Sequence, residues 1–229
     1  MRESIEILGN EVIYDMKTRQ GIDLEENPVD AAELTLECLR YMYRFLFMLF
    51  IEARPELGYA PMKSQTYVQG YSLEGLRDVC DQVKDDSEAL AEGYYIDDTL
   101  KKLFHMTYFG YPEDLEAYKK AIEIEKTSMH DVFTIEALKA HIFDPEYTKM
   151  ITAAKLRNSC MLRIIDLMSL TRATGRRNGR RGRISYANLG INQMGAVYEA
   201  LLSYRGFIAE HDLYEVKRAG AVTIICSLM

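Results

Sequence analysis

The sequence has few of the residues that build metal centres or disulfide scaffolds. Its 229 residues include only four cysteines and four histidines. The cysteines lie far apart without the short pairwise spacing of a zinc site, and no two histidines have the i, i+4 spacing that places two metal ligands on one face of a helix. The pattern therefore predicts neither a metal site nor a disulfide framework, and unpaired thiols favour a reducing cytoplasm.

Long hydrophobic runs and a secretory leader are also lacking. The longest apolar stretch, residues 41–51, is interrupted by Arg44 and is much shorter than the roughly 18–20 residues needed to cross a bilayer. The first residues, Met1 to Glu6, carry acids where a signal peptide begins with a basic region. We therefore expect a cytoplasmic protein without a membrane partner.

A glycine-rich turn between a strand and a helix, which would bring backbone amides to a phosphate or a cofactor, is missing too. The one glycine-rich stretch, residues 175–182, lacks both the Gly-Lys-Ser/Thr ending and a preceding apolar strand. Pairs of acids occur, but each lies at a predicted helix end, where solvation and the helix dipole explain it. We expect no catalytic residue and no bound cofactor in this chain.

What the sequence does contain is a globular composition with uneven charge. Hydrophobic residues make up 48% and charged residues 28% of the chain, which is typical of a folded domain. Residues 1–149 carry a formal net charge of −14, whereas residues 150–229 carry +7. The basic third is suited to an anionic partner, although the overall charge opposes non-specific nucleic-acid binding.

Apolar residues recur at helical spacing through most of the chain, so the predicted fold class is all-α. Asn27 followed by Pro28 is typical of a helix start, Ser72 is a candidate cap for a second helix, and Asn192 for the last one. We expect a multi-helix, bundle-like array with irregular connections and few or no strands. The expected helices cover residues 28–52, 73–84, 97–110, 111–124, 144–170 and 192–204.

The pattern divides the chain into four parts. Residues 1–170 form an acidic helical domain, residues 171–183 a basic arginine and glycine loop, residues 184–218 a C-terminal helical segment, and residues 219–229 an uncharged, atypical tail. We expect the tail either to be buried by a partner or to replace lost sequence.

The basic loop is the one segment with a plausible binding chemistry. It contains six arginines and no acid, and guanidinium groups pair with the phosphates of a DNA backbone. The alternative is a solvated linker, since the loop has no aromatic residue to stack on bases. The predicted nucleic-acid-binding residues are Arg172, Arg176, Arg177, Arg180, Arg181 and Arg183.

Several strings along the chain, in a preserved order, resemble one known family. They are residues 43–47 (YRFLF), 50–57 (FIEARPEL), 71–77 (YSLEGLR), 100–104 (LKKLF), 137–144 (ALKAHIFD), 183–191 (RISYANLGI) and 195–202 (GAVYEALL). Together they resemble the helical region of type IIG restriction–modification enzymes and of related large adenine-specific DNA methyltransferases of phage-defence systems. The strings from residue 183 onward resemble the signature that precedes the methyltransferase domain.

The resemblance implies a spacer between an upstream part, often a nuclease, and a downstream methyltransferase that uses S-adenosylmethionine. Neither the Asn-Pro-Pro-Tyr/Phe motif that holds a flipped adenine nor the glycine turn that binds the cofactor occurs in this chain. We therefore do not expect methyl transfer by this chain alone. The implied partners are DNA and a methyltransferase or nuclease polypeptide.

Three functional hypotheses stay open at this point. The first is a non-catalytic helical connector module that contacts the DNA backbone through the arginine loop. The second is one subunit of a split adenine-specific DNA methyltransferase. The third is a free-standing interaction protein.

Overall fold

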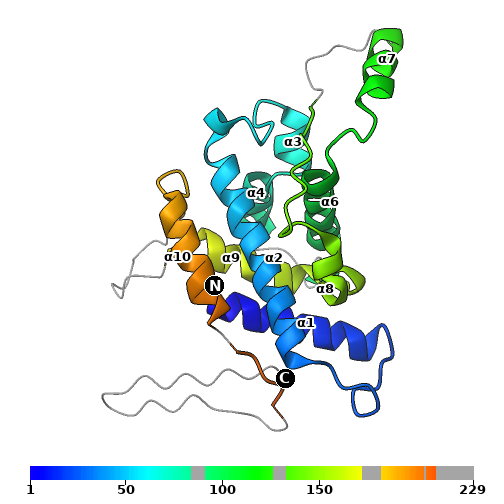
Figure 1. Cartoon of the computed structure of the whole chain (residues 1–229), viewed down its shortest axis with the longest axis vertical. Coiled ribbons are helices and arrows are strands. Elements are labelled where there is room, and N and C mark those ends of the chain that lie inside the picture. Colours follow the sequence, from blue (N-terminus) through cyan, green and yellow to red (C-terminus); the bar gives the residue numbers. More distant parts are fainter. Residues whose placement is uncertain (84–90, 126–132, 172–181, 204, 210–229) are drawn as a thin grey trace.

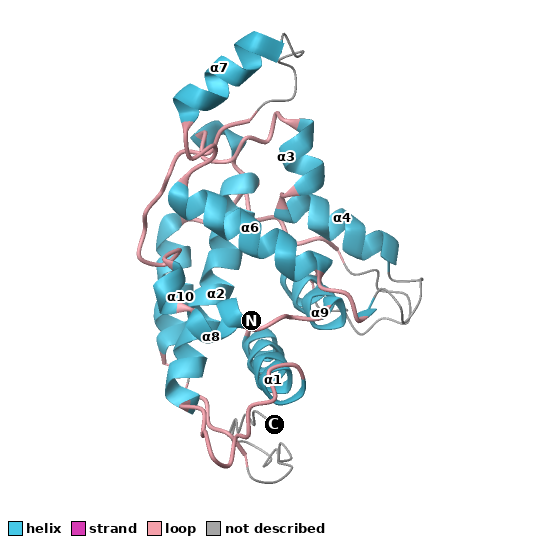
Figure 2. Ribbon diagram, turned by 90° about the vertical axis from the view of Figure 1, so that its right-hand side faces the viewer, coloured by secondary structure: helices cyan, strands magenta, loops and turns pink. Residues whose placement is uncertain are grey.

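The structure is a computed structural model that describes residues 1–83, 91–125, 133–171, 182–203 and 205–209. In this part of the chain the ribbon consists of helices and loops (Figure 2). Two isolated bridges join described residues, Tyr111 with Ile135 and Leu170 with Arg183. The predicted all-α class is confirmed.

Helix α2 (Ala31–Glu52) runs through the middle of the molecule and contacts α1, α4, α8 and α10 (Figure 1). Its aromatic and aliphatic residues are buried on several sides, as expected for a central helix. The predicted start at Asn27 and Pro28 is wrong. Asp30 is the cap, because its carboxylate accepts hydrogen bonds from the amides of Ala32 and Glu33 at 2.8 and 3.2 Å.

Helix α1 (Arg2–Thr18) packs against α2 and α9 and was not predicted. Leu8 and Val12 on its inner face are fully buried, but Glu11 and Asp15 are buried beside them. These acids interrupt the apolar pattern. Their ion-pair partners explain why such polar residues are tolerated in the interior.

A short turn, η1 (Pro55–Leu57), and helix α3 (Gln65–Gly70) lead to α4 (Leu73–Val83). Ser72 caps α4 as predicted, since its hydroxyl oxygen accepts a hydrogen bond from the amide of Gly75 at 2.9 Å. Helix α6 (Tyr95–Phe109) ends at Gly110, as predicted, where the backbone φ of 91° suits glycine.

The long helix predicted over residues 144–170 is wrong. The structure instead has η3 (Pro145–Tyr147), α8 (Lys149–Ala153) and α9 (Asn158–Ser169). Carboxylates from distant helices hold the connection between α8 and α9. Asp97 accepts a hydrogen bond from the amide of Leu156 at 3.2 Å, and Glu11 accepts one from the amide of Arg157 at 3.1 Å.

Two helices lie at the outside of the array. Helix α7 (Leu115–Glu125) projects from the body in both views (Figures 1 and 2). Helix α10 (Ile191–Leu202) packs on α2, where the rings of Tyr43 and Tyr198 meet edge to face at 4.8 Å. Gly190 precedes this helix, so the predicted cap at Asn192 is wrong; the Gln193 side chain accepts a hydrogen bond from the amide of Gly190.

None of the helices in the described residues combines the length and apolar character that a bilayer span requires.

Candidate functional site

The candidate site is the junction between the arginine segment, residues 171–183, and the helical body. Five of its predicted binding residues, Arg172, Arg176, Arg177, Arg180 and Arg181, lie outside the described residues. Of the six, only Arg183 is described. Their assignment to DNA therefore stays a prediction from the sequence.

Arg183 is held against α4 by two acids. Its guanidinium nitrogens lie 3.0 Å from the Glu74 carboxylate and 2.6 Å from the Asp78 carboxylate. The side chain is 38% exposed, so water screens both interactions. These acids would compete with a phosphate for the guanidinium, which sets Arg183 apart from arginines without an acidic neighbour.

The two ends of the arginine segment are hydrogen-bonded to each other. The amide of Thr171 donates to the carbonyl of Gly182 at 2.8 Å, and the amide of Gly182 donates to the Thr171 hydroxyl at 3.0 Å. One step further, the amide of Ile184 donates to the carbonyl of Ser169 at 2.7 Å. The segment thus begins and ends at one position, directly after α9.

Buried polar groups stabilise this junction from the interior of the protein. Arg77 is 7% exposed. Its guanidinium donates to the carbonyls of Ser169 and Ile184 at 3.3 and 3.2 Å and pairs with Glu74 at 2.8 Å. The Tyr186 hydroxyl donates to the carbonyl of Met168 at 2.5 Å, and burial raises the pKa of Tyr186 to about 12. Residues on both sides of the arginine segment are therefore tied to α4 and α9.

Glu52, the last residue of α2, organises the start of α4. Its carboxylate accepts hydrogen bonds from the Tyr67 hydroxyl at 2.9 Å and from the amides of Leu73 and Glu74 at 3.0 Å each. Burial raises the pKa of Glu52 to about 7, against the opposing effect of these three donors. A buried carboxylate thereby links the central helix to α4, the helix that carries Glu74 and Arg77.

A hollow of about 300 Å³ lies at the surface of this junction. Two acidic and two basic residues are among those that line it; the lining consists of Glu52, Ala53, Glu74, Arg77 and residues 183–187. Within the described part of the chain, no group of three or more His, Cys, Asp or Glu residues is arranged to hold a metal ion. The arrangement is chemically suited to fixing a segment in place and to meeting a polar partner.

Comparison with known proteins adds no relative, because no family model, no curated protein and no solved structure matches this chain.

Sequence reasoning missed the partners that build the junction. Glu52 and Arg77 lie within the strings that carry the family resemblance, but their roles depend on interactions with residues far along the chain. Arg77, for example, reaches Ile184, which is 107 positions away. No local signal identifies such a pair, whereas the uncompensated positive charge after residue 171 was visible in the composition.

Proposed function

We propose that this chain is a non-catalytic helical connector module of a DNA restriction–modification or phage-defence adenine methyltransferase system, acting in the cytoplasm and contacting the DNA backbone through its arginine segment. One observation supports the proposal most directly. The stretch that resembles the signature before a methyltransferase domain, residues 183–202, is anchored on the helical body through Arg77, Arg183 and Tyr186. A connector needs such an anchor, because it must hold its neighbour in a defined position.

The charge distribution favours DNA as the anionic partner. The arginine segment lies between two residues that are hydrogen-bonded to each other, Thr171 and Gly182. Its five remaining arginines have no acid in the same stretch of sequence. Arginine recognises phosphate through paired hydrogen bonds as well as charge. Interactions of this kind position a protein on DNA without reading its sequence.

The DNA contact is tested by fluorescence anisotropy with a short duplex at several salt concentrations. We expect the combined replacement of Arg172, Arg176, Arg177, Arg180 and Arg181 by alanine to weaken binding at low salt. The slope of log K against log salt should become shallower by about 0.9 for each phosphate that the variant no longer neutralises.

Arg183→Ala is the matched control in this experiment, because Arg183 is already paired with Glu74 and Asp78. We expect it to change the salt slope by less than the effect of a single phosphate. Equal binding by the fivefold variant and the unaltered protein would remove DNA binding from the proposal and leave the solvated linker.

The connector role is tested with the methyltransferase polypeptide encoded nearest to this gene, recognised by an Asn-Pro-Pro-Tyr motif and a cofactor turn. We expect the two proteins to co-purify and the present chain alone to transfer no methyl group from S-adenosylmethionine to DNA. Methylation that appears only when the two are mixed would favour the split-methyltransferase subunit. Inhibition of an already active enzyme would favour a free-standing interaction protein, and turnover by the isolated chain would contradict the connector role.

A further inference from the structure

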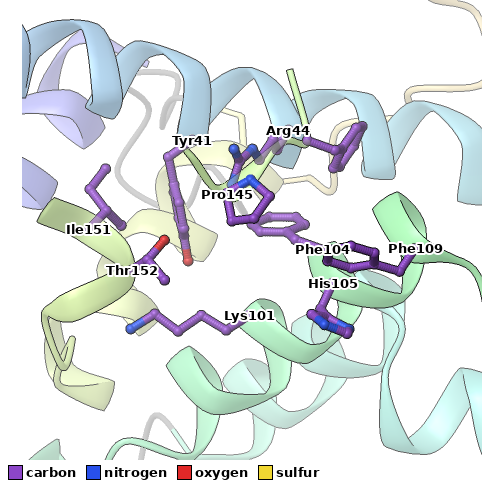
Figure 3. A pocket seen from close by; sticks show the side chains of 10 residues that line it. Tyr41, Arg44, Lys101, Phe104, His105, Phe109, Pro145, Ile151 and Thr152 are labelled. Atoms are coloured by element: carbon purple, nitrogen blue, oxygen red, sulfur yellow. The ribbon is translucent and has the colours of Figure 1, made fainter. Parts of the chain in front are cut away.

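A second cavity lies between α2, α6 and the stretch around α8 (Figure 3). Its volume is about 190 Å³. Most of its walls are aromatic or aliphatic, and polar groups reach it from both helices. The lining residues are Tyr41, Arg44, Lys101, Phe104, His105, Phe109, Phe143, Pro145, Ile151 and Thr152.

The Tyr41 hydroxyl is a buried polar group without a hydrogen-bond partner among the described residues. The residue is only 1% exposed. In Figure 3 its ring extends from α2 toward Thr152 and Lys101, with the hydroxyl at the far end. Buried hydroxyls are nearly always hydrogen-bonded, so an unpaired one at a cavity wall marks a position where an acceptor would be stabilised.

Arg44 adds a buried positive charge to the same cavity. The residue is 4% exposed, and its guanidinium donates hydrogen bonds to the carbonyls of Ile142 and Asp144. In the described part of the chain it forms no ion pair with an acid. The Glu37 carboxylate accepts hydrogen bonds from the amides of Met150 and Ile151, and its charge and that of Asp144 act on Arg44 from beyond ion-pair distance. Desolvation lowers the pKa of Arg44 to about 10, so it stays charged at neutral pH.

The other cation of the cavity is neutralised. The Lys101 ammonium lies 2.8 Å from the Asp97 carboxylate and also donates to the carbonyl of Ala154. Arg44 is therefore the cation of the cavity wall that has no acid within ion-pair distance among the described residues. A buried guanidinium without a direct ion-pair partner is costly, and a bound anion would lower that cost.

The aromatic walls favour a flat ligand. The rings of Tyr41 and Phe104 meet edge to face at 5.3 Å, and Phe104 and Phe143 lie 5.9 Å apart. At the rim, Phe109 is 44% exposed and His105 and Thr152 are also exposed, which connects the cavity with solvent. Aromatic rings pack well against such edges and faces.

We propose that this cavity binds a small aromatic carboxylate, with its ring between the aromatic side chains and its carboxylate directed to the Arg44 guanidinium and the Tyr41 hydroxyl. The volume of the cavity is sufficient for an aromatic ring, since an apolar cavity of about 150 Å³ accepts benzene and the present one is larger. The donors agree as well, because a guanidinium and a hydroxyl are both suited to a carboxylate oxygen. This site is independent of the proposed connector role.

The test is a titration of the full-length protein with benzoate, followed by NMR of its isoleucine methyl groups. Ile151 lines the cavity, whereas Ile5 and Ile13 on α1 are buried elsewhere and serve as internal references. We expect the Ile151 signal to shift with saturation and the reference signals to stay in place. Benzamide, which has the same shape without the charge, should bind at least about tenfold more weakly, as expected for losing a charged hydrogen bond.

Tyr41→Phe is the decisive variant, because it removes only an unpaired hydroxyl and should leave the fold intact. We expect it to weaken benzoate binding about tenfold. Arg44→Lys keeps a charge but loses the paired geometry and should weaken binding further; should this variant not fold, Tyr41→Phe still tests the site. A shift of all isoleucine signals together, no shift at millimolar benzoate, or equal binding by Tyr41→Phe would overturn the proposal.

Discussion

At the scale of single residues, Glu52 couples the stability of the protein to pH. Its folded-state pKa of about 7 lies above the ordinary value of 4.5, so between these two values the folded protein binds more protons than the unfolded chain. Stability contributed by this group is therefore complete below about pH 4.5 and is lost as the pH rises through about 7.

The variant Glu52→Gln removes this titration. Between pH 5 and 6.5 we expect the free energy of unfolding of the unaltered protein to fall more steeply with pH than that of the variant, by up to about 1.4 kcal/mol per pH unit, the effect of one proton. Urea unfolding followed by circular dichroism at several pH values measures both slopes. Parallel curves would show that Glu52 ionises normally in the folded protein.

For two buried tyrosines we expect opposite effects of replacement by phenylalanine on stability. The Tyr41 hydroxyl has no hydrogen-bond partner among the described residues, whereas the Tyr67 hydroxyl donates to Glu52 at 2.9 Å. We expect Tyr41→Phe to leave the free energy of unfolding unchanged or raise it by up to about 1 kcal/mol, and Tyr67→Phe to lower it by about 1–3 kcal/mol. Chemical denaturation of the two variants measures the difference. A similar loss in both would mean that the Tyr41 hydroxyl is bonded in solution.

At the scale of helices, α1 and α9 are joined by one buried and one exposed ion pair. Glu11 is 6% exposed and accepts hydrogen bonds from the Arg157 guanidinium at 2.7 and 2.9 Å, as well as from the Arg157 amide. Glu3 pairs with Arg163 at 2.7 Å, but both side chains are about half exposed. Only the first pair also fixes the start of α9.

This contrast gives a matched prediction for the two acids. We expect Glu11→Ala to lower the free energy of unfolding by about 3 kcal/mol, because it leaves a partly buried guanidinium and an amide unpaired. Glu3→Ala should cost less than about 1 kcal/mol, as is usual for exposed pairs. Thermal or urea unfolding measures both variants. Equal effects would mean that burial of Glu11 does not matter for the packing of α1 on α9.

Individual helices show what could and could not be predicted from the sequence. Helix α4 and the end of α6 were predictable, since Ser72 and Gly110 are local signals at helix ends. Helix α1 and the break between α8 and α9 were not. Glu11, a buried acid, interrupts the apolar pattern of α1 and accepts a hydrogen bond from the amide before α9, and its partner Arg157 lies 146 positions away.

At the scale of the whole molecule, the candidate site was predictable only in its charge. The arginines after residue 171 stand out in the sequence, but the junction at Thr171 and Gly182 is assembled from three regions of the chain: the end of α2, helix α4 and the residues around α9. Arg183, for instance, pairs with Glu74 from a distance of 109 positions. Long-range pairs between common charged residues leave no pattern in a single sequence.

Arg77 lies where these regions meet, so replacing it should loosen the packing of the whole junction. We expect Arg77→Met to increase amide hydrogen exchange at Ile184 and its neighbours, because the carbonyls of Ser169 and Ile184 both lose their buried donor. Arg183→Ala, on the exposed side of the same junction, should change exchange there much less. Hydrogen exchange read by mass spectrometry compares the two variants over residues 182–190.

The same two variants connect the anchor with partner binding. If the connector role is correct, Arg77→Met should also weaken co-purification with the methyltransferase polypeptide more than Arg183→Ala does. The connector can position that polypeptide only while residues 183–202 stay fixed to the helical body. Unchanged exchange in Arg77→Met would show that the segment is held by other interactions. Unchanged co-purification despite faster exchange would separate the anchor from partner binding.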